Sequence, residues 1–326
     1  MASHNVPWQL REFFFGRFDK MSRITVVCNG NCFQIQLSPS NFCQSPLALE
    51  TYTHFMDAVC DDEDYRLSYA AEEDLHHWAL TPFLPMFAQT TPTPPNQQPL
   101  TLRDYLSPEI YRYSLYAVNE RLEPRLDYDV PTQPCVAGVD PGDITLHHTW
   151  RQFVPESIEL CVSDHDEGLS QLPRKVLADG TVCFFKPVDY DDKRAAIREM
   201  GVYKEMKAQG ISDEAHAPHF IGVVCEEQNA RIIGLLLSWV DCGNRTLECA
   251  LRPDTPLTLR TKWDQQVTTA LACLHDAGIV WGDVKAANVL IDNNENAWVV
   301  DKDQMETIQG DTAGLVKIKE LIHATR

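Results

Sequence analysis

The stretch "HDAGIVWGDVKAANVLID" (275–292) places three chemically capable side chains close together. Asp283, Lys285 and Asn288 interrupt a run that otherwise has the composition of a turn and a strand. Phosphoryl transfer needs a carboxylate to orient the acceptor hydroxyl, a cation near the transferred phosphate and oxygen ligands for Mg²⁺. We therefore expect Asp283 to be the catalytic base, Lys285 the counter-charge to the γ-phosphate and Asn288 a metal ligand.

A second metal ligand is expected at Asp301. The segments "ANVLID" and "NAWVVD" have the composition of two short strands, and "NNEN" separates them. A hairpin between them would bring the end of the second strand, and Asp301, beside Asn288 at the start of the first. Magnesium prefers hard oxygen donors and few protein ligands, so one Asn and one Asp suit it.

The elements that must position these residues alternate between strands and helices. Asp179-Gly180 lies between two β-rich runs in 173–188, which favours a hairpin with a primed turn. Apolar residues recur at helical spacing in 191–210 and in 258–278, and a glycine ends each of these runs. Further strands are expected in 218–227 and 230–240, and a final amphipathic helix is expected in 310–323.

Residues 172–303 resemble the catalytic domain of eukaryotic-type protein kinases. The family's loop is written H-R-D-x-K-x-x-N, and Asp283 to Asn288 keep its spacing, while Asp301 falls where the family has the metal-binding Asp of D-F-G. "VCFFK" ends in Lys186, which matches the strand lysine that contacts the α- and β-phosphates. Glu199 in "IREMGVYKEM" matches the ion-pair partner of that lysine. The tail "ETIQGDTAGLVKIKELI" is similar to compact kinase-like proteins of fungi.

The resemblance also implies a nucleotide site and a reaction. "LLLSWVDCG" (235–243) falls where the hinge of these kinases binds adenine, which implies that Ser238 and Val240 contact the base. It implies ATP and Mg²⁺ as cofactors, and transfer of the γ-phosphate to a Ser or Thr hydroxyl of a protein. It implies an α+β, two-lobed kinase-like fold whose second lobe is truncated, because 326 − 301 = 25 residues follow Asp301.

Several positions depart from the family pattern and leave two further hypotheses open. Trp281 and Gly282 replace the His and Arg of the loop motif, Lys302-Asp303 replace Phe-Gly, and no G-x-G-x-x-G precedes Lys186. These departures are typical of a pseudokinase that acts as a binding scaffold for a protein partner. The Gly-Asp pair and the missing peptide-binding lobe are also compatible with a kinase that phosphorylates small molecules.

The first half of the chain is expected to form a separate α+β region. In 23–37, Asn29-Gly30 between two β-rich runs predicts a hairpin, and 45–60 has helical spacing. We expect an N-terminal region in 1–89, a proline-rich linker in 90–100, a helical connector in 101–150 and the kinase-like domain in 151–326. Within that domain the lobes are expected at about 172–240 and 241–326. The pairs His76-His77 and His147-His148 lack the spacing of a zinc site.

Composition narrows the class of protein. The net charge is −19 and no stretch is basic, which disfavours a partner made of nucleic acid or of anionic lipid. Eleven cysteines without a CxxC pair indicate reduced thiols. No signal-peptide core and no run of 18 apolar residues is present. We therefore expect an intracellular protein, cytoplasmic or nuclear. The kinase resemblance, and not the composition, implies that it binds a nucleotide and a protein substrate or partner.

Overall fold

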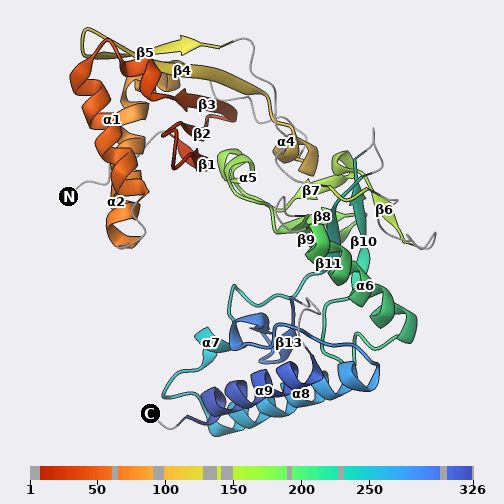
Figure 1. Cartoon of the computed structure of the whole chain (residues 1–326). Coiled ribbons are helices and arrows are strands. Elements are labelled where there is room, and N and C mark those ends of the chain that lie inside the picture. Colours follow the sequence, from red (N-terminus) through yellow and green to blue (C-terminus); the bar gives the residue numbers. More distant parts are fainter. Residues whose placement is uncertain are drawn as a thin grey trace. The chain divides into compact units, whose positions relative to one another are not determined.

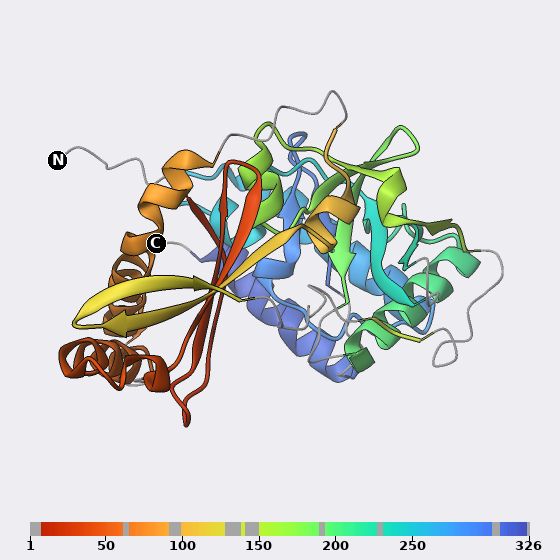
Figure 2. The same ribbon diagram turned by 90° about the horizontal axis from the view of Figure 1, so that it is seen from above.

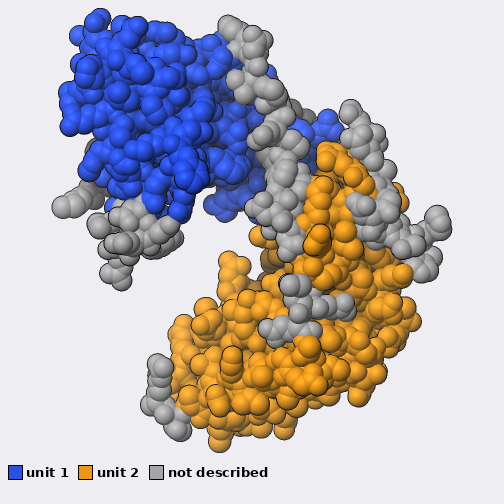
Figure 3. Space-filling view, in the orientation of Figure 1, with its two compact units in different colours: residues 1–135, 159–173 blue, residues 136–158, 174–326 orange. Residues whose placement is uncertain are grey.

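The computed structural model describes residues 8–60, 65–90, 99–127, 138–140, 150–188, 193–226, 231–301 and 307–324. The chain is a mixed α and β protein with several sheets, as expected. It divides into two compact units (Figure 3). Unit 1 comprises Met1–Cys135 and Glu159–Pro173, and unit 2 comprises Val136–Ile158 and Arg174–Arg326.

Unit 1 is built on a five-stranded sheet of order β1-β2-β3-β4-β5, in which only the β3–β4 pair is parallel. Its strands are β1 (Gln9–Phe15), β2 (Ser22–Cys28), β3 (Asn31–Leu37), β4 (Ile110–Val118) and β5 (Arg121–Leu126). Its helices are α1 (Pro46–Val59), α2 (Tyr65–Leu80), α3 (Leu84–Gln89), α4 (Leu102–Leu106) and α5 (His165–Ser170), with 3₁₀ turns at Pro39–Phe42 and Thr81–Phe83. The expected hairpin and the expected helix in 45–60 are both confirmed.

The core of unit 1 lies between the sheet and the helices α1 and α2, which run side by side (Figures 1 and 2). Alternation along β3 creates the buried face, because Phe33, Ile35 and Leu37 point into this core while Gln34 and Gln36 point to the other side. Tyr52 and Met56 of α1 are fully buried against them.

The helical connector expected in 101–150 is wrong over most of its described length. Only α4 is helical there, and 110–126 form the strands β4 and β5. The face of the sheet that α1 and α2 cover receives every second residue of β4, namely Tyr111, Tyr113 and Leu115. This alternation is typical of a strand, and it decided the structure of the segment although residues with high helix propensity surround it. Residues 91–98 of the expected linker, and His147-His148, lie outside the described residues.

Unit 2 contains a six-stranded sheet of order β6-β10-β11-β9-β8-β7 and a small two-stranded sheet. The strands are β6 (Gln152–Phe153), β7 (Ile158–Leu160, at the border with unit 1), β8 (Lys175–Ala178), β9 (Thr181–Pro187), β10 (Phe220–Cys225), β11 (Ile232–Ser238), β12 (Val289–Ile291) and β13 (Ala297–Val299). The β8–β9 hairpin turns at Asp179-Gly180 as predicted, with φ values of 46° and 74°.

The helices of unit 2 are α6 (Lys193–Gln209), α7 (Leu247–Ala250), α8 (Leu257–Asp276) and α9 (Ile308–His323), with 3₁₀ turns at Pro155–Ser157 and Ala286–Asn288. The helices expected in 191–210, 258–278 and 310–323 are confirmed. Helices α8 and α9 pack along each other (Figure 1). One core cluster joins residues of the large sheet, of α6, of α8 and α9 and of the β12–β13 hairpin. Among the helices that the structure describes, none has both the length and the apolarity that a membrane span requires.

Candidate functional site

An ion-pair triad in unit 2 joins residues far apart in the sequence. Lys186 on β9 places its Nζ 2.9 Å from a carboxylate oxygen of Glu199 on α6 and 2.7 Å from Oδ1 of Asp301, which follows β13. Glu199 is buried, while Asp301 is about half exposed. Burial alone would lower the pKa of Lys186, but the carboxylates of Glu199 and Asp301 raise it above its ordinary value. The ammonium group therefore stays charged.

Packing in the large sheet fixes the position of Lys186. Lys186 pairs with Leu235 of β11, and the neighbouring Phe185 is fully buried. Gly234 makes room for that ring, because a Cβ at position 234 would lie 2.3 Å from Phe185 Cε2 and 2.8 Å from the Lys186 carbonyl oxygen. The lysine therefore projects from a rigid strand.

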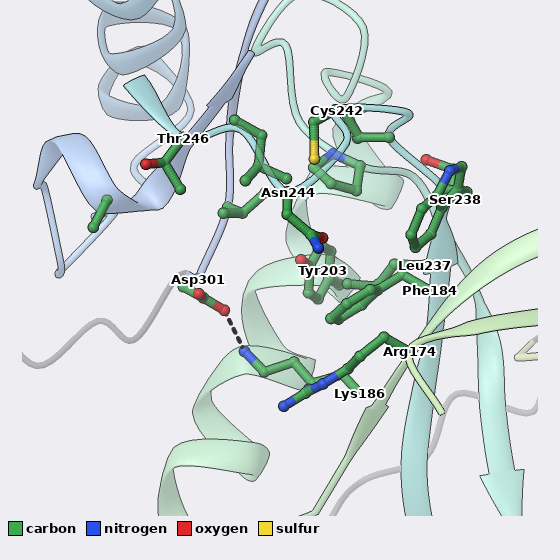
Figure 4. Close-up of a pocket in the computed structure, with 16 residues that line it drawn as sticks. Arg174, Phe184, Lys186, Tyr203, Leu237, Ser238, Cys242, Asn244, Thr246 and Asp301 are labelled. Carbon is green, nitrogen blue, oxygen red and sulfur yellow. Dashed lines mark hydrogen bonds and ion pairs between the residues drawn. The ribbon is translucent and has the colours of Figure 1, made fainter. Parts of the chain in front are cut away.

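A pocket of about 330 Å³ lies beside this triad, within the size range of small-molecule sites. Figure 4 shows its lining, with Lys186 and Asp301 joined near one end. Its walls are mostly apolar. They come from β9, α6, the segment before β10, the end of β11 with the segment after it, the 3₁₀ turn 286–288 and the β12–β13 hairpin: Phe184, Tyr203, Pro218, Leu237, Trp239, Val240, Ala287, Leu290 and Val300. The charged side chains of the lining, Arg174, Lys186 and Asp301, lie near one end, and Ser238, Asn244 and Thr246 add uncharged polar groups elsewhere in the wall. This distribution suits a ligand with a flat part that carries a few hydrogen-bonding groups and with an anionic part.

Both residues that the resemblance assigned to the base, Ser238 and Val240, line this pocket. Ser238 is held in place by two hydrogen bonds to His219: its N–H donates to the His219 carbonyl, and its hydroxyl accepts from the His219 N–H, each at 2.9 Å. The Val240 carbonyl accepts the Cys242 N–H at 3.0 Å, which closes a tight turn at the end of the segment.

The loop residues Asp283, Lys285 and Asn288 form a second polar cluster. Asp283 Oδ2 lies 2.7 Å from Lys285 Nζ and accepts a hydrogen bond of 2.7 Å from Asn288 Nδ2, which also donates to the Asp283 carbonyl at 3.1 Å. Asn288 is buried, whereas Lys285 is more than half exposed. The hydrogen bond to Asp283, and the nearby Asp283 and Asp301 charges, raise the pKa of Lys285. Lys285 is therefore a fully charged cation at neutral pH.

The β12–β13 hairpin brings the two clusters together, as predicted. Val289 pairs with Val299, and the Val300 N–H donates to the Asn288 carbonyl at 3.0 Å. Asp301 follows directly and has a φ of 53°, in the left-handed region, without the assistance of a glycine at this position. This turn directs its carboxylate to Lys186. Residues 302–306, including Lys302-Asp303, lie outside the described residues.

Asp311 on α9 anchors the loop and was not among the predicted site residues. It is fully buried, and it accepts the N–H groups of Trp281 and Gly282 at 2.8 Å each and a 2.8 Å contact from His275 Nε2. A carboxylate buried at this depth is costly unless several donors compensate it, and here three do. The sequence contained a signal that Asp311 is buried. Position 311 lies on the same face of the helix as the apolar residues Leu315, Ile318 and Ile322.

Close approach of α9 to the loop depends on a glycine. A Cβ at Gly314 would lie 2.6 Å from both the Cβ and the carbonyl oxygen of Val284. The loop is also tied to the end of β13, because Trp281, which is fully buried, donates from its ring Nε1 to the Val300 carbonyl at 2.9 Å. The loop 281–288 thus has a rigid frame on both sides.

The oxygen donors at Asn288 and Asp301 fit a magnesium ion. Both hydrogens of the Asn288 amide have acceptors on Asp283, which leaves its Oδ1 as the atom for a cation. Magnesium is commonly held by one or two carboxylates together with substrate phosphates. In the described part of the chain, no three His, Cys, Asp or Glu side chains converge as they would to hold a metal ion by themselves, so a cation here would depend on the Asn288 amide and on substrate oxygens as well.

Comparison of the sequence with models of protein families and with curated protein sequences finds no match. The function must therefore be inferred from the geometry of unit 2 itself. Every predicted site residue lies in one of the two clusters or in the pocket wall, and the β12–β13 hairpin joins these three parts. The arrangement places the charged groups of Lys186 and Asp301 at one end of a pocket and the half-exposed Asp283 carboxylate in the adjoining loop.

Proposed function

We propose that the chain is a protein-kinase-like phosphotransferase that binds ATP with Mg²⁺ in unit 2 and transfers the γ-phosphate to a Ser or Thr hydroxyl of a protein. The observation that carries this proposal is the triad of Lys186, Glu199 and Asp301, of which Lys186 and Asp301 line the charged end of the pocket. The order of the large sheet, with the lysine on a strand next to the hinge strand and the glutamate on the following helix, supports a kinase-like lobe. The loop 281–288, the hairpin and two packed helices form a short second lobe.

In this proposal, the chain's own residues position the reactants. Lys186 contacts the phosphates of the nucleotide, and Glu199 holds its ammonium group in place from α6. Asp283 orients the acceptor hydroxyl and takes its proton as the hydroxyl oxygen bonds to the γ-phosphorus and the bond to the bridging oxygen of ADP breaks. Lys285 lies 2.7 Å from Asp283, where its charge can follow the transferred phosphate.

Asn288 and Asp301 would hold the magnesium ion. A bound Mg²⁺ supplies charge neutralisation on the β- and γ-phosphates. The chain contributes a fixed distance between these two ligands, because the Val300 N–H bonds to the Asn288 carbonyl. It also contributes the left-handed turn at Asp301, which aims that carboxylate at the pocket.

A nucleotide-binding scaffold without turnover is the second candidate. One observation favours it: the segment Glu159–Pro173 belongs to unit 1, although it occupies the place before Lys186 where an active kinase has its phosphate-covering loop. In either case we place the protein inside the cell, since all ten cysteines that the structure describes are free thiols, as a reducing compartment maintains them.

Thermal unfolding with ATP, with and without Mg²⁺, tests the nucleotide site. A ligand that binds only the folded chain adds about 2.7 kcal/mol at 100 times its Kd, which raises the Tm by a few degrees. We expect this shift in the wild type, with its magnesium-dependent part lost in Asp301→Asn. Asparagine tolerates positive φ, so this variant keeps the turn. Asp254→Asn, an exposed position that does not line the pocket, is the control and should behave as wild type.

Radiolabelled γ-phosphate then separates the hypotheses about turnover. Label on protein supports the protein kinase, whereas label confined to small molecules supports a small-molecule kinase. A magnesium-dependent shift without transfer to any acceptor supports the scaffold. Absence of any shift with ATP contradicts the nucleotide site.

A further inference from the structure

The segment between β7 and β8 lies where the kinase resemblance expects a glycine-rich loop over the phosphates. It is instead built into unit 1. The Asp166 carboxylate on α5 accepts the N–H groups of Asn29 and Gly30 at 2.8 and 2.5 Å, which caps the β2–β3 turn. Ser170 bonds to the side chain of Gln9 at 2.7 Å, and Arg11 donates to the Leu169 carbonyl.

The backbone of this segment offers few groups to a phosphate. The N–H groups of Glu167, Gly168 and Gln171 are all bonded within the segment, at 2.9 to 3.1 Å. Its one glycine is required by packing, because a Cβ at Gly168 would lie 2.9 Å from Val162 Cγ2 and 3.0 Å from Leu100 Cδ1. In a glycine-rich loop, backbone amides contact the phosphates. In this chain another group must therefore make those contacts.

Arg174, the first residue after this segment, lines the pocket in unit 2. Its guanidinium lies over the Phe184 ring, 5.6 Å from the centroid, and Figure 4 shows its side chain extending in the same direction as that of Lys186. The backbone of Arg174 is fixed, since its carbonyl accepts the Phe185 N–H at 2.9 Å. Within the described part of the chain, no carboxylate pairs with this guanidinium.

The charges around Lys186 leave a need for additional positive charge, which Arg174 can supply. One ammonium of Lys186 faces two carboxylates, Glu199 and Asp301, so the triad by itself carries one net negative charge. A phosphate chain entering next to it needs further positive charge. A guanidinium is always protonated and presents parallel N–H donors that match two phosphate oxygens.

We propose that Arg174 binds the β- and γ-phosphates of the nucleotide and replaces the amides of a glycine-rich loop. This inference rests on the proposed nucleotide site and adds a residue to it. Phe184 supports the guanidinium from one side. The segment that ends at Pro173 belongs to unit 1, and Arg174 directly precedes β8 in unit 2 and lines the pocket.

Titration calorimetry with ATP, ADP and adenosine in the presence of Mg²⁺ tests this inference on the full chain. In Arg174→Gln we expect the Kd of ATP to rise about 10- to 100-fold, the range that hydrogen bonds to charged groups supply, and the Kd of adenosine to stay within twofold. Arg174→Lys should recover part of the loss, because it keeps the charge without the paired donors. Arg252→Gln removes an exposed arginine of unit 2 away from the pocket and should bind as wild type.

The outcomes separate this inference from the proposed function. If wild type binds ATP and Arg174→Gln binds it equally well, the role of Arg174 is wrong and the nucleotide site stands. If ATP and adenosine weaken equally, Arg174 acts by supporting the base through Phe184, and the phosphate contact is wrong. If wild type binds neither ATP nor adenosine, the proposed function fails and the inference fails with it.

Discussion

The two units bury different kinds of polar side chain. In unit 1 the buried polar residues that the structure describes are hydroxyls and one imidazole: Ser22, Thr25, Ser45, His76, Ser114 and Ser170. In unit 2 they are three carboxylates and one amide: Glu199, Asn288, Asp292 and Asp311. Burying a carboxylate costs several kcal/mol unless it is paired or receives hydrogen bonds, whereas a hydroxyl needs a single partner.

The carboxylates buried in unit 2 lower the stability of the fold unless they are paired. Their presence there therefore calls for an explanation other than stability. The pair Ser22 and Tyr52 in unit 1 shares one hydrogen bond of 2.9 Å and only supports packing. In unit 2, Glu199 fixes a lysine at the pocket and Asp311 fixes the loop of Asp283. Buried carboxylates thus distinguish the unit in which we place the proposed site, and the difference can be tested by removing individual groups from each unit.

Removal of the Asp283 carboxylate has the largest expected effect. If the proposed mechanism holds, Asp283→Ala removes the group that accepts the proton of the acceptor hydroxyl, so we expect phosphoryl transfer to fall by roughly 10²- to 10⁴-fold. The Kd of ATP should stay within twofold, because Asp283 does not line the pocket. Transfer of γ-labelled phosphate and titration calorimetry measure the two quantities, with Asp254→Ala as the control. An unchanged rate in Asp283→Ala would remove this loop from the chemistry.

Removal of the Asp311 carboxylate should destabilise unit 2. Asp311→Ala leaves two buried N–H groups and the His275 ring without their acceptor, so we expect the free energy of unfolding to fall by about 3–5 kcal/mol. Asp311→Asn keeps one acceptor oxygen and should lose less. Urea unfolding of the full chain, with hydrogen exchange to assign the change to a unit, measures it. A loss concentrated in unit 1, or one below about 1 kcal/mol, would contradict the anchoring role.

His76 gives unit 1 a dependence on pH. Burial lowers the pKa of His76 from its ordinary 6.5 to about 4, with His77 as a second cause, and Glu72 Oε1 is 4.0 Å from its Nε2, too far for a hydrogen bond. The unfolded chain takes up a proton as the pH falls through 6.5, while the folded chain stays neutral until about pH 4. The contribution of neutral His76 to the free energy of unfolding of unit 1 is therefore complete above pH 6.5 and is lost as the pH falls towards 4. Between pH 7 and pH 5 the loss of unfolding free energy amounts to about 2 kcal/mol.

Hydrogen exchange of the β2 and β3 amides at pH 7 and pH 5 measures this loss in the full chain. His76→Phe, which keeps a ring in the contact with Phe13, should remove most of the pH dependence from unit 1. His77→Gln removes only the secondary cause of the shift and should retain most of this pH dependence. A wild-type unit 1 equally stable at both pH values would show that His76 is protonated in the fold.

Local signals in the sequence predicted much of this structure. Both Xaa-Gly hairpins form, with Asn29 at φ 51° and Asp179 at φ 46°, because the primed turn depends only on its own residues. The helices with regular apolar spacing were also found. The juxtaposition of Asn288 and Asp301 followed from a short hairpin, which is again a local feature.

The errors and omissions concern contacts between distant residues. Strand β4 was taken for a helix because its pairing with β3 crosses more than 70 residues, and no local pattern specifies a parallel partner. Asp311 contacts a loop about 30 residues before it, and the segment around Asp166 contacts a turn more than 130 residues before it. Arg174 was missed for the same reason, since its position just before β8 brings it into the pocket wall only when the pocket is formed.

The course of the chain between the units has a consequence for biosynthesis. Unit 1 lacks α5, and with it the cap on the β2–β3 turn, until Pro173 has left the ribosome, although Val136–Ile158 of unit 2 emerge earlier. The N–H groups of Trp281 and Gly282 likewise have no acceptor until Asp311 of the last helix has been translated. A nascent chain therefore completes unit 1 late and can anchor the loop 281–288 only after α9 has been made, so a shorter polypeptide lacks the anchored geometry of this loop.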